Sequence, residues 1–407
     1  LKMDKITKED KIKHIASHNE KYENKGFDTR AIHTGQAPDS FYGSVNTPIH
    51  MSSTFAQTDA ADPFYTYDYG RGGNPTREAL ETVIASLEGG KYGLVAGSGI
   101  GITMLITHTL KSGDHILSVD DVYGGTGRYF RTIAEPVYGM TTDFIDMTDL
   151  DLVRSSIKEN TKMIWLETPT NPLLKCFDIK AIGEIAKENN ILFVVDNTFM
   201  SSYNQRPLEL GADIVMNSVT KYLGGHSDVV MGCASTNDKD IYDKVYFNLF
   251  AIGPATSPMD CYFVLRSIKT LSIRMEKINS NALTLAKYLE NEASVDKVYY
   301  PMLESHKYYE IHKKQATGGA GIISFIVKDG TAETSRKFLK ALKVFTFAES
   351  LGGVESLAEC PALMTHASVP KAHREAIGIV DGLVRIAVGI ENIEDLIADI
   401  QQALDQL

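Results

Sequence analysis

The feature that most constrains the fold is an alternation, between residues 78 and 270, of short apolar runs with stretches of helical periodicity. Four apolar runs, which include β-branched residues, occupy residues 115–119, 162–166, 191–195 and 212–216. In the intervening stretch 179–188, Ile182, Ile185 and Ala186 fall on one helical face. The alternation predicts βαβ units, and therefore a mostly parallel sheet with helices on both faces.

The segments on either side of this region have different patterns. Residues 1–65 are polar and interrupted by Gly and Pro, which predicts an extended N-terminal arm of the kind that wraps a partner subunit. Residues 66–271 then form the large domain. Within residues 272–407 the pattern changes to a helical stretch at 283–290, strands at 321–327 and 383–388, and an amphipathic terminal helix. This last segment predicts a smaller α+β domain.

The composition excludes several functions. A formal net charge of −11 argues against a nucleic-acid partner, because such binding depends on clustered Lys and Arg. No apolar run reaches the length of a membrane span and the first residues lack a signal core, so we expect a cytoplasmic protein without a membrane partner. No cysteine or histidine cluster has metal-ligand spacing, so no metal site is predicted. The dispersed cysteines are expected to be reduced thiols: Cys176, Cys233, Cys261 and Cys360.

Polar residues follow three of the predicted strands, at the edge where α/β sheets bind ligands. Asp196 could keep the ring nitrogen of pyridoxal 5'-phosphate (PLP) protonated, which makes the ring an electron sink. The alternative is that Asp196 only caps the next helix. Lys221 lies before a Gly-rich loop, and desolvation would favour the neutral amine that forms a Schiff base. The alternative for Lys221 is an ordinary surface lysine.

A phosphate site is predicted near the start of another helix. Ser98, Gly99 and Ile100 open the helical stretch that continues to residue 110, and helix N-termini attract phosphate through their N–H groups and dipole. Ser218 and Thr220 could add hydroxyl donors. Gly-rich helix starts are common and the GxGxxG spacing is missing. This segment therefore indicates a phosphate site only together with Asp196 and Lys221.

Five motifs resemble one enzyme family. SVTKYLGGHSD at 218–228 is similar to the PLP-attachment signature of the Cys/Met-metabolism enzymes, and the likeness continues in YGRGGNPT (69–76), DVYGGT (121–126), ETPTNP (167–172) and VDNT (195–198). GTGRYF (125–130) and FAESLGG (347–353) resemble the eukaryotic cystathionine γ-lyase branch. The resemblance covers roughly residues 28–405.

The resemblance implies a fold type I enzyme with a seven-stranded sheet, PLP as cofactor, and a homotetramer of active dimers. Lys221 would be the Schiff-base lysine, while Tyr123 would stack on the ring and act as acid and base. Tyr69 and Arg71 would reach the cofactor phosphate of the neighbouring subunit. The remaining cofactor contacts would come from Ser98, Gly99, Ile100, Asn171, Asp196, Thr198, Ser218 and Thr220.

The resemblance also implies a substrate site. Arg385 would hold the substrate α-carboxylate through its planar fork, with an internal ion pair as the alternative. Because a phenol pKa near 10 is too high for a base at pH 7, we expect cations such as Arg71 to lower the pKa of Tyr123. The other expected substrate contacts are Arg71, Tyr123, Arg128, Glu349, Ser350 and Thr365.

The activity implied by the resemblance is α,γ-elimination of L-cystathionine to L-cysteine, 2-oxobutyrate and ammonia, with hydrogen sulfide release from cysteine as a side activity. The first alternative is the γ-replacement of cystathionine γ-synthase, which shares the motif around Glu349. Methionine γ-lyase is less favoured because Gly125 stands where those enzymes usually have cysteine. A catalytically silent PLP-binding fold is disfavoured by the joint presence of Lys221, Asp196, Tyr123 and Arg385.

Overall fold

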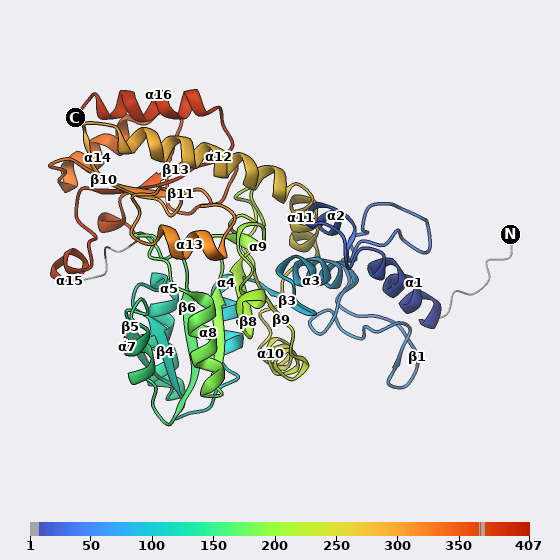
Figure 1. The fold of residues 1–407 in the computed structure, drawn as a ribbon. Coiled ribbons are helices and arrows are strands. Elements are labelled where there is room, and N and C mark those ends of the chain that lie inside the picture. Colours follow the sequence, from blue (N-terminus) through green and yellow to red (C-terminus); the bar gives the residue numbers. More distant parts are fainter. Residues whose placement is uncertain (1–7, 366, 368–370) are drawn as a thin grey trace.

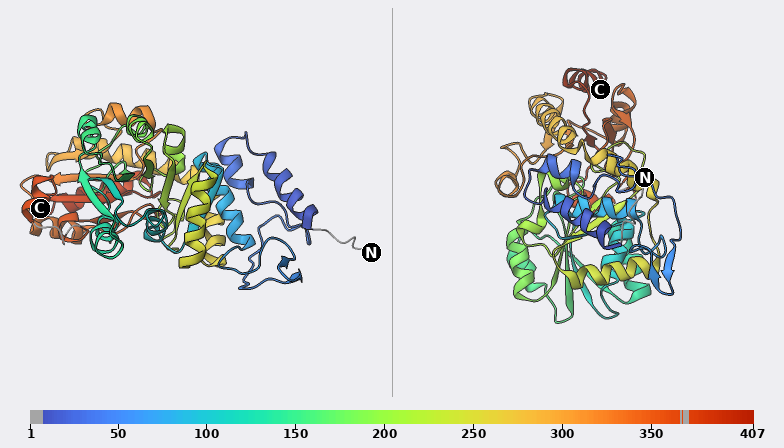
Figure 2. Two further views of the ribbon diagram at one scale, coloured as in Figure 1. Left: turned by 90° about the horizontal axis from the view of Figure 1, so that it is seen from below. Right: turned by 90° about the vertical axis from the view of Figure 1, so that its right-hand side faces the viewer.

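Two large β-sheets organise the chain, which also has a two-stranded sheet in its N-terminal segment (Figure 1). The structure, a computed structural model, describes residues 8–365, 367 and 371–407. A seven-stranded sheet occupies the middle of the chain, and a five-stranded sheet lies toward its carboxyl end. The N-terminal segment and the carboxyl terminus lie at opposite ends of the molecule (Figure 2).

The seven-stranded sheet has the order β3-β9-β8-β7-β6-β4-β5. Its strands are β3 (Tyr92–Ala96), β4 (His115–Val119), β5 (Thr141–Ile145), β6 (Thr161–Glu167), β7 (Leu192–Asp196), β8 (Ile214–Ser218) and β9 (Gly232–Thr236). The pairs from β5 to β8 are all parallel, whereas β9 runs antiparallel to both β8 and β3. The predicted mostly parallel sheet is therefore confirmed.

Helices cover both faces of this sheet. The connections β4 to β5 and β5 to β6 run in opposite directions along the sheet, so right-handed crossovers place them on opposite faces. On one face α4 packs on α5 and α10, and on the other α7 packs on α8. The helices of this part are α3 (Pro75–Glu88), α4 (Gly99–Thr107), α5 (Gly124–Tyr129), η1 (Phe130–Ala134), α6 (Glu135–Tyr138), α7 (Leu150–Ser155), α8 (Ile179–Glu188), α9 (Ser201–Asn204), η2 (Pro207–Leu210), α10 (Lys239–Ile252) and α11 (Pro258–Ile268).

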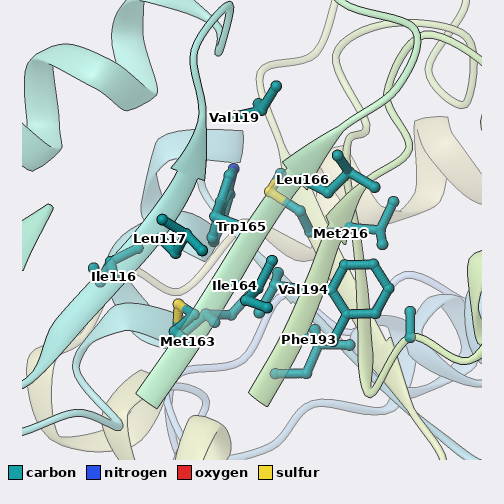
Figure 3. Close-up of a cluster of buried hydrophobic side chains, with 14 of the residues drawn as sticks. Ile116, Leu117, Val119, Met163, Ile164, Trp165, Leu166, Phe193, Val194 and Met216 are labelled. Carbon is teal, nitrogen blue, oxygen red and sulfur yellow. The ribbon is translucent and has the colours of Figure 1, made fainter. Parts of the chain in front are cut away.

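The core lies between the sheet and these helices. Figure 3 shows side chains of three neighbouring strands, among them Leu117 of β4, Trp165 of β6 and Val194 of β7, and all three are fully buried. The Trp165 ring meets Phe130 edge-on at 5.6 Å. Strands buried on both faces have continuous apolar runs, which explains why these runs do not alternate with polar residues.

The smaller α+β unit begins with α12 (Leu271–Glu290), and the predicted domain boundary at 271/272 falls at its first residues. Its sheet has the order β10-β11-β14-β13-β12. The other elements are β10 (Val295–Tyr299), α13 (Tyr309–Gln315), β11 (Ile322–Val327), α14 (Ala332–Ala341), β12 (Thr346–Phe347), β13 (Leu357–Glu359), η3 (Pro361–Leu363), α15 (Lys371–Ala376), β14 (Leu383–Ala387) and α16 (Ile393–Leu404). The predicted α+β character is confirmed, whereas the exact domain boundary stays a prediction.

The N-terminal arm is only partly extended. Residues 1–7 of the predicted arm lie outside the described residues, and the next segment forms α1 (Lys8–Glu20) and α2 (Phe27–His33), followed by β1 (Gln57–Asp59) and β2 (Asp62–Pro63). The predicted extended conformation was wrong for residues 8–20 and 27–33, which are helical. Helix α1 is polar and has almost no apolar periodicity. It is anchored by contacts such as the hydrogen bond that the Gly35 N–H donates to Asn19 Oδ1.

No helix among the described residues is long and apolar enough to cross a membrane. The four cysteines are buried free thiols.

Candidate active site

A cavity of about 340 Å³ lies at the carboxyl ends of β6, β7 and β8 and reaches the smaller sheet. Its volume is in the range of small-molecule sites. Most of the predicted site residues line it: Ser98, Gly99, Ile100, Tyr123, Asn171, Asp196, Thr198, Ser218, Thr220, Lys221, Glu349, Ser350, Thr365 and Arg385. The fold thus brings together residues that are far apart in the sequence, such as Ser98 and Arg385, which are separated by nearly 290 positions.

Two carboxyl groups lie side by side on the floor of the cavity. Glu167 and Asp196 are opposite each other at the ends of β6 and β7. Asp196 Oδ1 accepts the Thr198 N–H at 3.0 Å and lines the cavity, but it does not cap the next helix, α9, whose N-cap is Met200. Burial raises the pKa of Asp196 to about 6. A cationic ring nitrogen placed beside Asp196 would favour its charged form.

Lys221 follows β8 in a tight turn whose Gly225 has a φ of 67°. Its Nζ donates a hydrogen bond of 2.7 Å to Ser350 Oγ, which comes from the carboxyl-terminal unit. Burial, followed by the charge of Arg385, lowers the pKa of Lys221 to about 8. A neutral amine, the nucleophilic form of lysine, is therefore readily available near neutral pH.

The N-terminus of α4 meets the end of β8. Ser98 Oγ caps the helix by accepting the Gly101 N–H at 2.9 Å. A Cβ on Gly99 would lie 3.2 Å from Ser218 Cβ, so glycine lets the helix N-terminus approach the hydroxyls of β8 closely. Backbone N–H groups and the Ser218 hydroxyl consequently line one end of the cavity, together with Thr220, whose Oγ1 donates to the Met231 carbonyl oxygen at 3.2 Å. This set of donors suits a phosphate.

Tyr123 lies at the mouth of the cavity with 47% of its surface exposed. Its backbone N–H donates to Glu167 Oε2 at 2.7 Å. Burial raises the pKa of the Tyr123 phenol, while the charges of Arg128 and Arg385 act in the opposite direction. Within one chain, the cations that act on the pKa of Tyr123 are Arg128 and Arg385, and the lowering of this pKa by Arg71 stays a prediction.

Arg385 is only 3% exposed and is held by three groups. Nη1 donates to Asn171 Oδ1 at 2.9 Å and lies 3.0 Å from Glu359 Oε1. Nη2 donates to the Ser350 carbonyl oxygen at 2.9 Å. The internal ion pair considered as an alternative therefore exists, yet Nε has no hydrogen-bond partner among the described residues. Arg385 therefore has an ion pair with Glu359 and also an Nε–H without a partner.

Three predicted site residues do not line this cavity within one chain. Tyr69 and Arg71 are exposed on the segment before α3, where Arg71 Nε donates to the Phe250 carbonyl oxygen at 3.0 Å. Arg128 is exposed on α5 near Tyr123. The cavity also has lining residues that were not predicted: Thr103, Thr126, Glu167, Phe199, Met216, Val230 and Leu351. Of these, Glu167 had a visible signal, its place at a strand end.

The residues present fit PLP. The α4 N-terminus with Ser218 and Thr220 suits its phosphate, Asp196 its ring nitrogen, Tyr123 a ring face and Lys221 its aldehyde carbon. The fold and this cavity define a PLP-dependent enzyme of fold type I.

Comparison with known proteins gives the family. The family model described as "Cys/Met metabolism PLP-dependent enzyme" matches residues 28–405. A cystathionine gamma-lyase of Dictyostelium discoideum is 50% identical over 93% of this chain and 97% of its own length. The crystal structures of metB from Corynebacterium glutamicum (TM-score 0.91, 45% identity, 94% and 98% of the two chains) and of cystathionine gamma-lyase from Lactobacillus plantarum complexed with L-serine (0.90, 41%, 93% and 98%) have the same fold. This chain belongs to the Cys/Met metabolism family of PLP-dependent enzymes.

Proposed function

We propose that this enzyme cleaves L-cystathionine by α,γ-elimination, giving L-cysteine, 2-oxobutyrate and ammonia with the uptake of one water. The observation that carries the proposal is the convergence of Lys221, Tyr123 and Arg385 on one cavity. The cystathionine gamma-lyase of Dictyostelium, at 50% identity, supports the choice of substrate.

The side chains divide the work by their chemistry. Arg385, which lines the cavity, would bind the substrate α-carboxylate and so fix the orientation of Cα. Lys221, whose pKa is lowered to about 8, would take the Cα proton and relay protons along the chain toward Cβ. Tyr123 at the cavity mouth would donate a proton to the leaving sulfur. PLP, when bound, supplies a ring that withdraws electrons from the substrate.

The proposed enzyme is a homotetramer in the cytoplasm, built from dimers that share active sites. Tyr69 and Arg71 would complete the phosphate site of the neighbouring subunit, which accounts for their distance from the cavity of their own chain. Large apolar side chains exposed on the N-terminal segment and on α10 support such an interface, because exposed apolar clusters favour association. They include Phe41, Tyr42, Val45, Met51, Phe247 and Phe250.

The test incubates the PLP-loaded enzyme with cystathionine and, separately, with an activated homoserine ester plus cysteine, and identifies the products by mass spectrometry. Cysteine with 2-oxobutyrate from cystathionine is the expected result. Efficient cystathionine synthesis in the second reaction would transfer the assignment to a γ-synthase. The absence of both products would refute each of these activities.

A further inference from the structure

A further buried carboxyl group, that of Glu359, lies 3.0 Å from Arg385 Nη1. Glu359 is the last residue of β13 and is 0% exposed. The antiparallel pairing of β13 with β14 places it opposite Arg385 in register. Unlike Arg385, Glu359 does not line the cavity, so it contacts the arginine from the protein side.

The contacts of the guanidinium determine which of its donors face a ligand. An arginine side chain has five N–H donors. Nη1 donates to Asn171 Oδ1 and lies 3.0 Å from Glu359 Oε1 in an ion pair, and Nη2 donates one hydrogen to the Ser350 carbonyl oxygen. Nε is buried and has no hydrogen-bond partner among the described residues. Because Arg385 lines the cavity, a substrate carboxylate would bind at the Nη hydrogens that Asn171 and Ser350 leave free.

The charge of Glu359 also stabilises the buried guanidinium of Arg385. An unpaired guanidinium at 3% exposure would carry a large desolvation penalty, which the carboxylate at 3.0 Å offsets. Thr365 holds the carboxylate in turn, because its Oγ1 donates to Glu359 Oε1 at 3.0 Å. Thr365 lines the cavity. Glu359 is therefore fixed between the wall of the cavity and the arginine.

We propose that Glu359 is a positioning residue for substrate recognition: its ion pair with Nη1 holds the Arg385 guanidinium so that the Nη hydrogens left free by Asn171 and Ser350 are presented to the substrate α-carboxylate. The inference rests on the proposed role of Arg385 in carboxylate binding, but not on cystathionine being the substrate. Glu359 acts only through Arg385, so it should govern binding of the carboxylate more than the later chemical step.

The first test measures kcat and KM separately for cystathionine with the PLP-loaded enzyme. In Glu359→Ala the guanidinium loses its anchor, and we expect KM to rise roughly tenfold or more while kcat changes much less. Glu359→Gln keeps an oxygen acceptor for Nη1 and should recover most of the lost affinity. A tenfold fall of kcat with an unchanged KM in Glu359→Ala would overturn the proposal.

The second test does not need turnover of cystathionine. L-serine and ethanolamine, which lacks the carboxylate, are titrated into the PLP-loaded enzyme, and binding is followed by the change in cofactor absorbance. We expect the preference for serine over ethanolamine to shrink roughly tenfold or more in Glu359→Ala and to vanish in Arg385→Ala. If Glu359→Ala does not fold, Glu359→Asp is used in its place, because the shorter side chain moves the carboxylate away from Arg385. An unchanged preference in the folded Glu359 variant, beside its loss in Arg385→Ala, would refute the proposal.

Discussion

Ser350 joins Lys221 to Arg385 through two different atoms. Its Oγ accepts the Lys221 Nζ hydrogen bond at 2.7 Å, and its carbonyl oxygen accepts from Arg385 Nη2 at 2.9 Å. The residue makes both contacts with a φ of 101°, a backbone conformation that non-glycine residues rarely adopt. Strain of this kind costs on the order of 1–3 kcal/mol and is found mainly at functional sites.

Ser350→Gly and Ser350→Ala separate the hydroxyl from the backbone strain. Both remove the acceptor for Lys221, so we expect kcat to fall about tenfold in each. Only glycine relieves the strained φ, so Ser350→Gly should be about 1 kcal/mol more stable than Ser350→Ala in denaturant unfolding. Asp329→Gly, at another positive-φ residue outside the cavity, is the control and should keep its kcat. Equal unfolding midpoints for the two Ser350 variants would show that the backbone there is not strained.

Lys221→Ala should lose the visible absorption band of the covalently held cofactor. The variant lacks the only lysine that lines the cavity within the described residues, so no other lysine of the cavity wall can replace its amine. We expect kcat to fall by roughly a hundredfold to ten-thousandfold. Lys162→Ala, which removes an exposed lysine of β6, should keep both the band and the activity. A persistent band in Lys221→Ala would assign the linkage to another residue.

Glu88, at the end of α3, should make stability depend on pH. It is 1% exposed and accepts from Asn217 Nδ2 at 2.7 Å, and burial raises its pKa from 4.5 to about 8. The folded protein therefore binds more protons than the unfolded chain between these pH values, and the free energy of unfolding falls as pH rises through the window. The loss is about 1.4 kcal/mol per pH unit.

Glu88→Gln removes this titration and keeps an acceptor for Asn217. We expect the variant to match the native protein in denaturant unfolding near pH 4.5 and to be clearly more stable at pH 8. Glu184→Gln, at an exposed position of α8, should follow the native pH profile. A stability difference that is the same at both pH values would mean that Glu88 does not titrate in this range.

Mixing two inactive variants tests the shared active site. Arg71→Ala retains Lys221, and Lys221→Ala retains Arg71. If Arg71 serves the neighbouring subunit, each hybrid dimer contains one intact site, and randomly mixed subunits should recover about a quarter of native activity. If Arg71 acts within its own chain, co-expression of the two variants will yield no more activity than either variant alone.

Much of the fold and site could be predicted because the signals are local. The apolar runs of β4, β6 and β7 are buried on both faces, and Asp196 and Lys221 follow strands at the ligand-binding edge. Glu359 was not found, because its partnership with Arg385 arises from the β13–β14 register between segments 26 residues apart in the numbering. Helix α1 was missed because its polar sequence has little apolar periodicity.

The cavity draws its two walls from different sheets. Asp196, Ser218 and Lys221 belong to the strands and turns of the large sheet, whereas Ser350 and Arg385 come from the smaller one. The residues proposed to hold the cofactor and the arginine proposed to hold the substrate carboxylate are thus encoded in separate stretches of the gene, on either side of α12. A chimera joined near α12 within the family would pair one enzyme's cofactor wall with another's carboxylate-binding wall.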